Sequence, residues 1–186
     1  MPSLVFNRFA ILRECSFFLT PVIQPSGNRK ITRLMTHGAR RTLTMPEVLV
    51  LSERDAQLHH PARREVCISI TDPGKPLPFL STHFLAVLRL AFSDITEAID
   101  HPNYVLFNER HAMEILWFVS LWGKVDRIVI HCQAGVSRSP GIAAALCELF
   151  GWGLPSRLQD RNAPGNRWVR DELIRVGEGA ASCKDG

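Results

Sequence analysis

Apolar side chains recur along the chain in four short runs that have the length and β-branched content of strands. The runs cover residues 47–51, 64–70, 87–92 and 125–130. The last run ends in Arg127-Ile-Val-Ile130, which is almost purely β-branched, as in a strand with both faces buried. We therefore expect four strands, the last of them buried.

Between and after these runs the spacing changes to that of helices, and the expected helices cover residues 53–60, 109–122, 142–150 and 167–176. Ser52 and Asn108 are the expected N-caps of the first two helices. For the third helix we expect Ser139 as the N-cap, Pro140 at the first helical position and Gly151 as the stop.

Strands that alternate with helices predict an α/β fold, a single domain with a mostly parallel central sheet flanked by helices. The predicted domain covers residues 45–178, with a disordered tail at 179–186. In such sheets ligands bind beyond the carboxyl ends of the strands, so the residues after 130 are the first place to look for chemistry.

The net charge of +4 is unevenly distributed. Residues 1–44 hold seven basic side chains and one acidic one, whereas the remaining residues hold 15 basic and 17 acidic side chains. The domain is thus mildly acidic and has no basic face suited to nucleic acid.

The Arg-rich, acid-poor segment 1–44 has two interpretations: it is typical of an organelle transit peptide, or translation begins at Met45. Its longest uncharged apolar run, residues 15–23, is too short to span a bilayer. In both cases we expect residues 1–44 to lie outside the fold.

The junction after the fourth run combines a nucleophile with an anion site. Cys132 opens a loop and Arg138 closes it, with five residues between them and a helix beyond. Backbone N–H groups and the positive end of a helix dipole converge on such a loop, and an arginine offers a planar fork for two phosphate oxygens. This field favours a thiolate, which is the nucleophilic form of cysteine. The spacing predicts both side chains on the rim of one small loop.

The stretch His131-Cys132-Gln-Ala134-Gly135-Val-Ser137-Arg138-Ser139 resembles the signature of the cysteine-dependent protein tyrosine phosphatases, most closely that of their dual-specificity branch. The resemblance extends from about residue 45 to about residue 176. It implies a protein phosphatase that forms a cysteinyl-phosphate, without a cofactor or a metal.

That resemblance also implies an aspartate on a loop after an upstream strand, which protonates the leaving oxygen and later activates water. Asp94 directly follows the third expected strand and is the first candidate. Asp100 is the second candidate because the separation from Asp94 to Cys132 is long for compact members of the family. Asp72 is the third, since its Asp-Pro-Gly context is by itself a sufficient turn signal.

The remaining roles follow the order of the motif. The resemblance implies that the Ser139 hydroxyl stabilises the departing thiolate, and His131 is expected to orient the loop and tune the thiol. The residues between Cys132 and Arg138 contribute backbone N–H groups to the substrate phosphate: Gln133, Ala134, Gly135, Val136 and Ser137. Gly135 is expected to meet a positive-φ or close-approach demand.

Five cysteines without paired spacing predict a reducing compartment, which we take as cytoplasmic unless residues 1–44 direct organelle import. Cys67, in a buried strand, is a candidate to trap an oxidised Cys132 as a disulfide.

The expected substrate is a protein carrying phosphotyrosine, and also phosphoserine or phosphothreonine under dual specificity. A phosphoinositide, another small phosphoester, an RNA 5′ phosphate and a non-catalytic phospho-binding module remain as alternatives. The uncharged Gln133, Val136 and Ser137 disfavour the phosphoinositide and RNA alternatives, which often use extra lysines in the loop.

Overall fold

The computed structural model describes residues 45–159 and 165–182. The predicted extension 1–44 and the last four residues of the predicted tail lie outside the described residues. These described residues belong to one compact unit. None of its described helices is long and apolar enough to cross a membrane.

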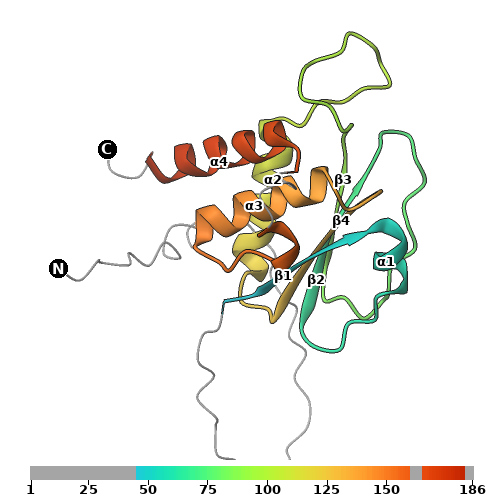
Figure 1. Ribbon diagram of the computed structural model, residues 1–186, viewed down its shortest axis with the longest axis vertical. Coiled ribbons are helices and arrows are strands. Elements are labelled where there is room, and N and C mark those ends of the chain that lie inside the picture. The colour runs from blue at the N-terminus through green and yellow to red at the C-terminus, as the bar shows by residue number, and fades with distance from the viewer. Residues whose placement is uncertain (1–44, 160–164, 183–186) are drawn as a thin grey trace, which may run out of the picture. The chain divides into compact units, whose positions relative to one another are not determined.

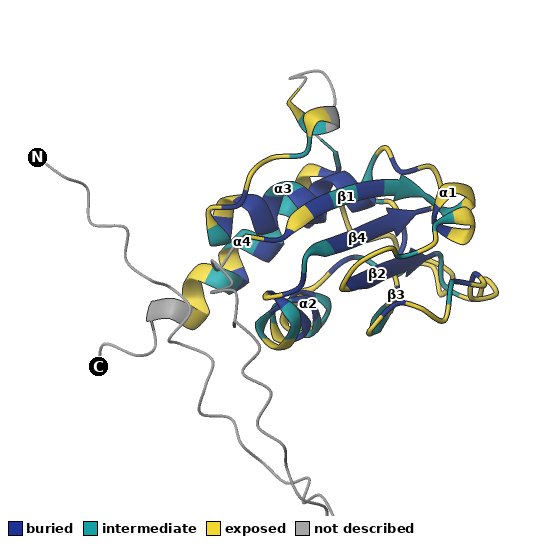
Figure 2. Cartoon of the chain, turned by 90° about the horizontal axis from the view of Figure 1, so that it is seen from below, coloured by how far each residue is buried: buried dark blue, intermediate teal, exposed yellow. Residues whose placement is uncertain are grey.

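Four parallel strands form a sheet in the order β1-β4-β2-β3. Their bounds are β1 (Glu47–Ser52), β2 (Glu65–Thr71), β3 (Val87–Ala91) and β4 (Arg127–Cys132). Every strand pair among the described residues is parallel, which confirms the predicted sheet type. β4 and β2 occupy the middle of the sheet and are almost entirely buried (Figure 2). This placement explains why the run ending at residue 130 is so rich in β-branched side chains.

The helices divide between the two faces of the sheet (Figure 1). On one face lie α2 (Glu109–Trp122), α3 (Arg138–Phe150) and α4 (Arg167–Ser182), and on the other lies the short α1 (Glu53–Leu58). Side chains alternate between the two faces along each strand. In β4, Ile130 and Cys132 therefore join the core under the three long helices, whereas Val129 joins the smaller core under α1.

Most element ends follow the expected caps. The Ser52 hydroxyl accepts from the Asp55 amide at the start of α1, and Asn108 caps α2 with a full capping box. Gly151 ends α3 in the left-handed conformation that glycine tolerates best. The expected end of the last helix is wrong: α4 continues to Ser182, six residues beyond the predicted end, and so extends into the predicted tail.

A buried ion cluster closes the end of the sheet opposite to the Cys132 loop. Glu65, at the start of β2, is fully buried and contacts His59 at 2.6 Å and Arg127 at 3.3 Å. Arg127 also contacts Glu47 at 2.8 Å. Because these residues stand at strand starts, the cluster joins β1, β2 and β4 and is structural.

Candidate active site

The loop between β4 and α3, residues 133–137, presents a row of free amides. Within the described residues, none of the backbone N–H groups from Ala134 to Ser137 donates a hydrogen bond. The loop is attached to the start of α1, because the Gln133 carbonyl accepts a hydrogen bond from the Glu53 amide at 3.1 Å. Consecutive N–H groups without acceptors, next to a helix N-terminus, make a concave site for an anion.

Gly135 gives the loop its tight curvature. Its φ is +71°, and a Cβ built on it would lie 2.7 Å from the Leu51 carbonyl oxygen. A side chain at this position would therefore meet both backbone strain and a clash with β1. Both of the expected demands on Gly135 are present.

Cys132 and Arg138 form the floor of the loop and not its rim, which corrects the sequence prediction. Each of the two residues is only 3% exposed. The reason is that β4 continues through Cys132 and α3 already begins at Arg138, so both belong to elements that face the core. An anion must enter the loop to reach the sulfur.

The guanidinium of Arg138 is bound through one of its three nitrogens, and the other two make no hydrogen bond within the described residues. Nη1 donates to Asp72 Oδ1 and to the Phe92 carbonyl, both at 2.7 Å. Neither Nε nor Nη2 has a hydrogen-bond partner among the described residues, although Nε is buried. Because a buried donor without a partner is costly, the Nε–Nη2 edge is suited to bind an anion that offers two oxygens.

Ser139 does not cap α3, contrary to the prediction from sequence. The helix begins at Arg138, Ser137 is at the N-cap position, and Ser137 makes no side-chain cap. The buried Ser139 hydroxyl instead donates to Cys132 Sγ at 3.1 Å, the contact that the expected role toward the thiolate requires. Pro140 is third in the helix, where its missing N–H costs nothing.

Asp94 lies against the loop, immediately beyond β3. Its Oδ1 accepts from Ser137 Oγ at 2.7 Å and from Asn166 Nδ2 at 2.8 Å. Its Oδ2 has no hydrogen-bond partner in the described part of the chain, and the residue is exposed. One oxygen is thus fixed to the loop while the other is available to carry a transferable proton.

The other two candidate aspartates lie elsewhere. Asp72 binds Arg138 and compensates its buried charge. Asp100 is exposed on the segment between β3 and α2, and it makes no hydrogen bond or ion pair with the loop within the described residues. Of the three candidates, only Asp94 accepts a hydrogen bond from a side chain within residues 133–137, that of Ser137, in the described structure.

A hollow of about 300 Å³ opens beside the loop. It is lined by Gln133, by Asp72 and by the segment from Lys75 to Phe79, together with residues at the start of α1. Leu77 and Phe79 are 60% and 84% exposed and form an apolar part of the wall, whereas Glu53 and Asp72 are acidic. Lys75 is the one cationic side chain of the described lining.

His131 is enclosed on the face of the sheet opposite to Cys132. Burial lowers the pKa of its imidazole to about 4, with a further decrease from the nearby Arg89 guanidinium, and a contact with the Cys132 backbone offsets this only partly. Neither ring nitrogen makes a well-aligned hydrogen bond within the described residues. A neutral, buried ring fits an orienting role better than proton transfer.

His131 should therefore make stability depend on pH. The unfolded chain binds a proton at this residue near pH 6.5, whereas the folded protein does so only near pH 4. Between these values the unfolded state holds more protons, so the free energy of unfolding falls as pH decreases, by up to about 3 kcal/mol, and His131 has no effect above pH 6.5. Urea unfolding at pH 7 and pH 5 should show a smaller loss in His131→Gln than in the wild type; equal losses would contradict this assignment.

Cys67 cannot serve as the disulfide partner of Cys132 that the sequence suggested. It is fully buried in β2 opposite Val129 and belongs to the core under α1, whereas Cys132 belongs to the core on the other face. Burial raises the pKa of the Cys67 thiol to about 12 and that of Cys147 to about 11. Both are inert core side chains.

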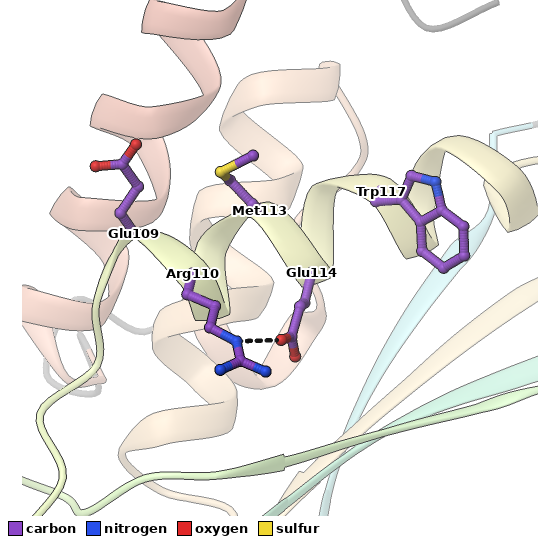
Figure 3. Close-up of a pocket in the computed structure, with 5 residues that line it drawn as sticks. All are labelled: Glu109, Arg110, Met113, Glu114 and Trp117. Carbon is purple, nitrogen blue, oxygen red and sulfur yellow. Dashed lines mark hydrogen bonds and ion pairs between the residues drawn. The ribbon is translucent and has the colours of Figure 1, made fainter. Parts of the chain in front are cut away.

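A second hollow, of about 600 Å³, lies on the surface of α2 and shares no residue with the loop (Figure 3). Met113 and Trp117 give it an apolar lining, and Arg110 pairs with Glu114 along its side. It contains no cysteine, serine or histidine. No group of three potential metal ligands occurs among residues 45–159 and 165–182.

Three contacts of the site were not anticipated from sequence. They are the pairing of Asp72 with Arg138, the side chain of Ser137 on Asp94, and the side chain of Asn166 on Asp94. The sequence predicts Asp72 as a turn residue or an acid, and Asp72 does begin a turn, in which the Lys75 N–H donates to the Asp72 carbonyl. The only available sequence signal for Asn166 was its place before the last helix.

No protein-family model and no curated protein matches this sequence. Among solved structures, human DUSP28 is similar with a TM-score of 0.42 and 17% identity, over 75% of this chain and 96% of that chain. Tk-PTP in its active form has a TM-score of 0.42 and 19% identity, over 72% of this chain and 92% of that chain. Superpositions of this quality decide neither fold nor function, which depend on the geometry of the chain itself.

Proposed function

We propose that this protein hydrolyses phosphate monoesters through a cysteinyl-phosphate on Cys132, and that its substrates are proteins carrying phosphotyrosine. One observation carries the proposal: Cys132 and the buried Arg138 stand at the two ends of a loop whose amides are free, and Arg138 keeps Nε and Nη2 without a partner among the described residues. A phosphate group supplies the oxygen acceptors that both sets of donors lack. The geometry of arginine and amides around a sulfur matches phosphoryl transfer better than simple binding.

The chemistry has two steps. The Cys132 thiolate attacks phosphorus, the Sγ–P bond forms, and the ester P–O bond breaks as Asp94 gives its proton to the leaving oxygen. Water then attacks the cysteinyl-phosphate, Asp94 accepts a proton from that water, and the Sγ–P bond breaks. The Ser139 hydroxyl, 3.1 Å from Sγ, stabilises the thiolate that departs in this second step.

Two features favour phosphotyrosine over the other substrate classes. The sulfur is buried, so the phosphate must be carried on a side chain long and slim enough to reach the floor of the loop, as tyrosine is. The neighbouring hollow offers Leu77 and Phe79 to an aromatic ring, and Lys75 is the one cation among its described lining residues. Polyphosphorylated inositol and RNA ends would need more positive charge than this lining supplies.

A substrate panel tests the proposal. We expect the highest kcat/KM for phosphotyrosine peptides, lower values for phosphoserine and phosphothreonine peptides, still lower values for phosphoinositides and RNA 5′ phosphates, and inhibition by vanadate. A phosphoinositide with the highest kcat/KM would replace the proposed substrate class. Binding of phosphotyrosine peptide without hydrolysis would identify a phospho-binding module instead.

A further inference from the structure

Asn166 uses every one of its polar groups to join three parts of the site. Its backbone N–H donates to the Ser137 carbonyl at 2.9 Å, which attaches it to the end of the loop. Its side-chain Nδ2 donates to Asp94 Oδ1 at 2.8 Å and to the Ile95 carbonyl at 3.3 Å. Its Oδ1 accepts from the Val169 amide at 3.1 Å, which caps α4.

Close backbone packing fixes Asn166 in this place. A Cβ on Gly141, in the first turns of α3, would lie 2.7 Å from the Asn166 carbonyl oxygen. A Cβ on Gly165, whose φ is +70°, would lie 2.6 Å from the Gly141 amide nitrogen. Two glycines thus let the start of α4 contact the start of α3, and Asn166 is only 5% exposed.

The amide of Asn166 also determines which oxygen of Asp94 is left free. Asn166 and Ser137 both donate to Oδ1, so this oxygen is fully engaged. Oδ2 is left without a partner among the described residues. Rotation of the Asp94 carboxylate would break the hydrogen bonds from Ser137 and Asn166. The amide of Asn166 is buried, so leaving it without an acceptor would be costly.

We propose that Asn166 is a positioning residue that holds Asp94 in register with the loop, so that Oδ2 meets the leaving oxygen while Arg138 and the amides hold the phosphate. This inference rests on the proposed function, in which Asp94 is the general acid. A second role of Asn166, as the cap of α4, is structural and separable. Serine can still cap a helix but has no amide to donate to Asp94.

The separating variant is Asn166→Ser, assayed on phenyl phosphate, a poor leaving group, and on para-nitrophenyl phosphate, a good one. Displacing the acid should lower kcat/KM for phenyl phosphate about tenfold to a hundredfold and leave that for para-nitrophenyl phosphate nearly unchanged. The melting temperature should change little. Asn108→Ala, which removes the cap of α2, is the matched control: it should lower the melting temperature and leave the ratio of the two substrates as in the wild type.

In an Asp94→Asn background, Asn166→Ser should add no further loss on phenyl phosphate, because the group that it positions is already gone. A full additional loss would mean that Asn166 acts elsewhere and would overturn the inference. The inference would also be overturned if Asp94→Asn changed the ratio of the two kcat/KM values and Asn166→Ser did not. The proposed function would stand in that case. If Asp94→Asn shows no leaving-group effect, the role of Asp94 fails and this inference fails with it.

Discussion

Replacing Cys132 by serine is expected to lower kcat/KM for phosphotyrosine peptides by more than roughly 10³-fold. A serine hydroxyl is far less ionised than a thiol, and the contact from Ser139 at 3.1 Å would then meet a hydroxyl instead of a thiolate. Arg138 and the loop amides are untouched, so peptide binding should persist. Initial rates and calorimetric titration with the same phosphotyrosine peptide measure the two effects separately.

The control for this substitution is Cys147→Ala, which changes a buried core cysteine of α3 whose thiol donates to the Gly153 carbonyl. It should keep most of the activity and lose some stability, since a small core side chain is removed. Appreciable turnover by Cys132→Ser would remove Cys132 as the nucleophile. A comparable loss in both variants would point to a damaged fold instead.

Asp94→Asn is expected to lower kcat/KM about 10²- to 10⁴-fold for phenyl phosphate and much less for para-nitrophenyl phosphate. Asparagine keeps the shape of the side chain and an oxygen that accepts from Ser137 and Asn166, so only the proton is lost. A good leaving group departs without protonation and hides the defect. The ratio of the two kcat/KM values, measured across the pH range of activity, isolates the acid.

The neighbouring aspartates distinguish this role from a general loss of charge. Asp72→Asn should mainly raise KM, because the ion pair that holds Arg138 Nη1 is weakened. Asp100→Asn should leave both parameters close to the wild-type values. A larger leaving-group effect from Asp100→Asn than from Asp94→Asn would transfer the acid to Asp100.

The strands and helices could be predicted because their signals are local. Apolar runs, Asn108 before α2 and Gly151 after α3 each specify an end or a face without reference to the rest of the chain. The start of α3 could not be placed the same way. The Ser139 hydroxyl has two possible partners, a helix amide and the Cys132 sulfur, and only the packed structure shows that the sulfur is its acceptor.

The chemistry of the loop could likewise be predicted from Cys132, Arg138 and the glycine between them, but its depth could not. Whether the sulfur lies on a rim or a floor depends on how far β4 and α3 extend into the loop, and this is decided by tertiary packing. The hydrogen-bond partners of Asp94 could not be predicted from the sequence for a different reason. Asn166 lies 72 residues away in sequence, and only the Gly141–Gly165 approach brings it to the loop.

The most direct test of a cysteinyl-phosphate is to isolate it. Wild-type protein would be mixed with a phosphotyrosine peptide carrying radiolabelled phosphate, quenched within one turnover and digested, and the labelled peptide identified by mass spectrometry. The label should appear on Cys132 in the wild type and be absent in Cys132→Ser. Steady hydrolysis of the peptide with no label on Cys132, or with label on another side chain, would contradict the account.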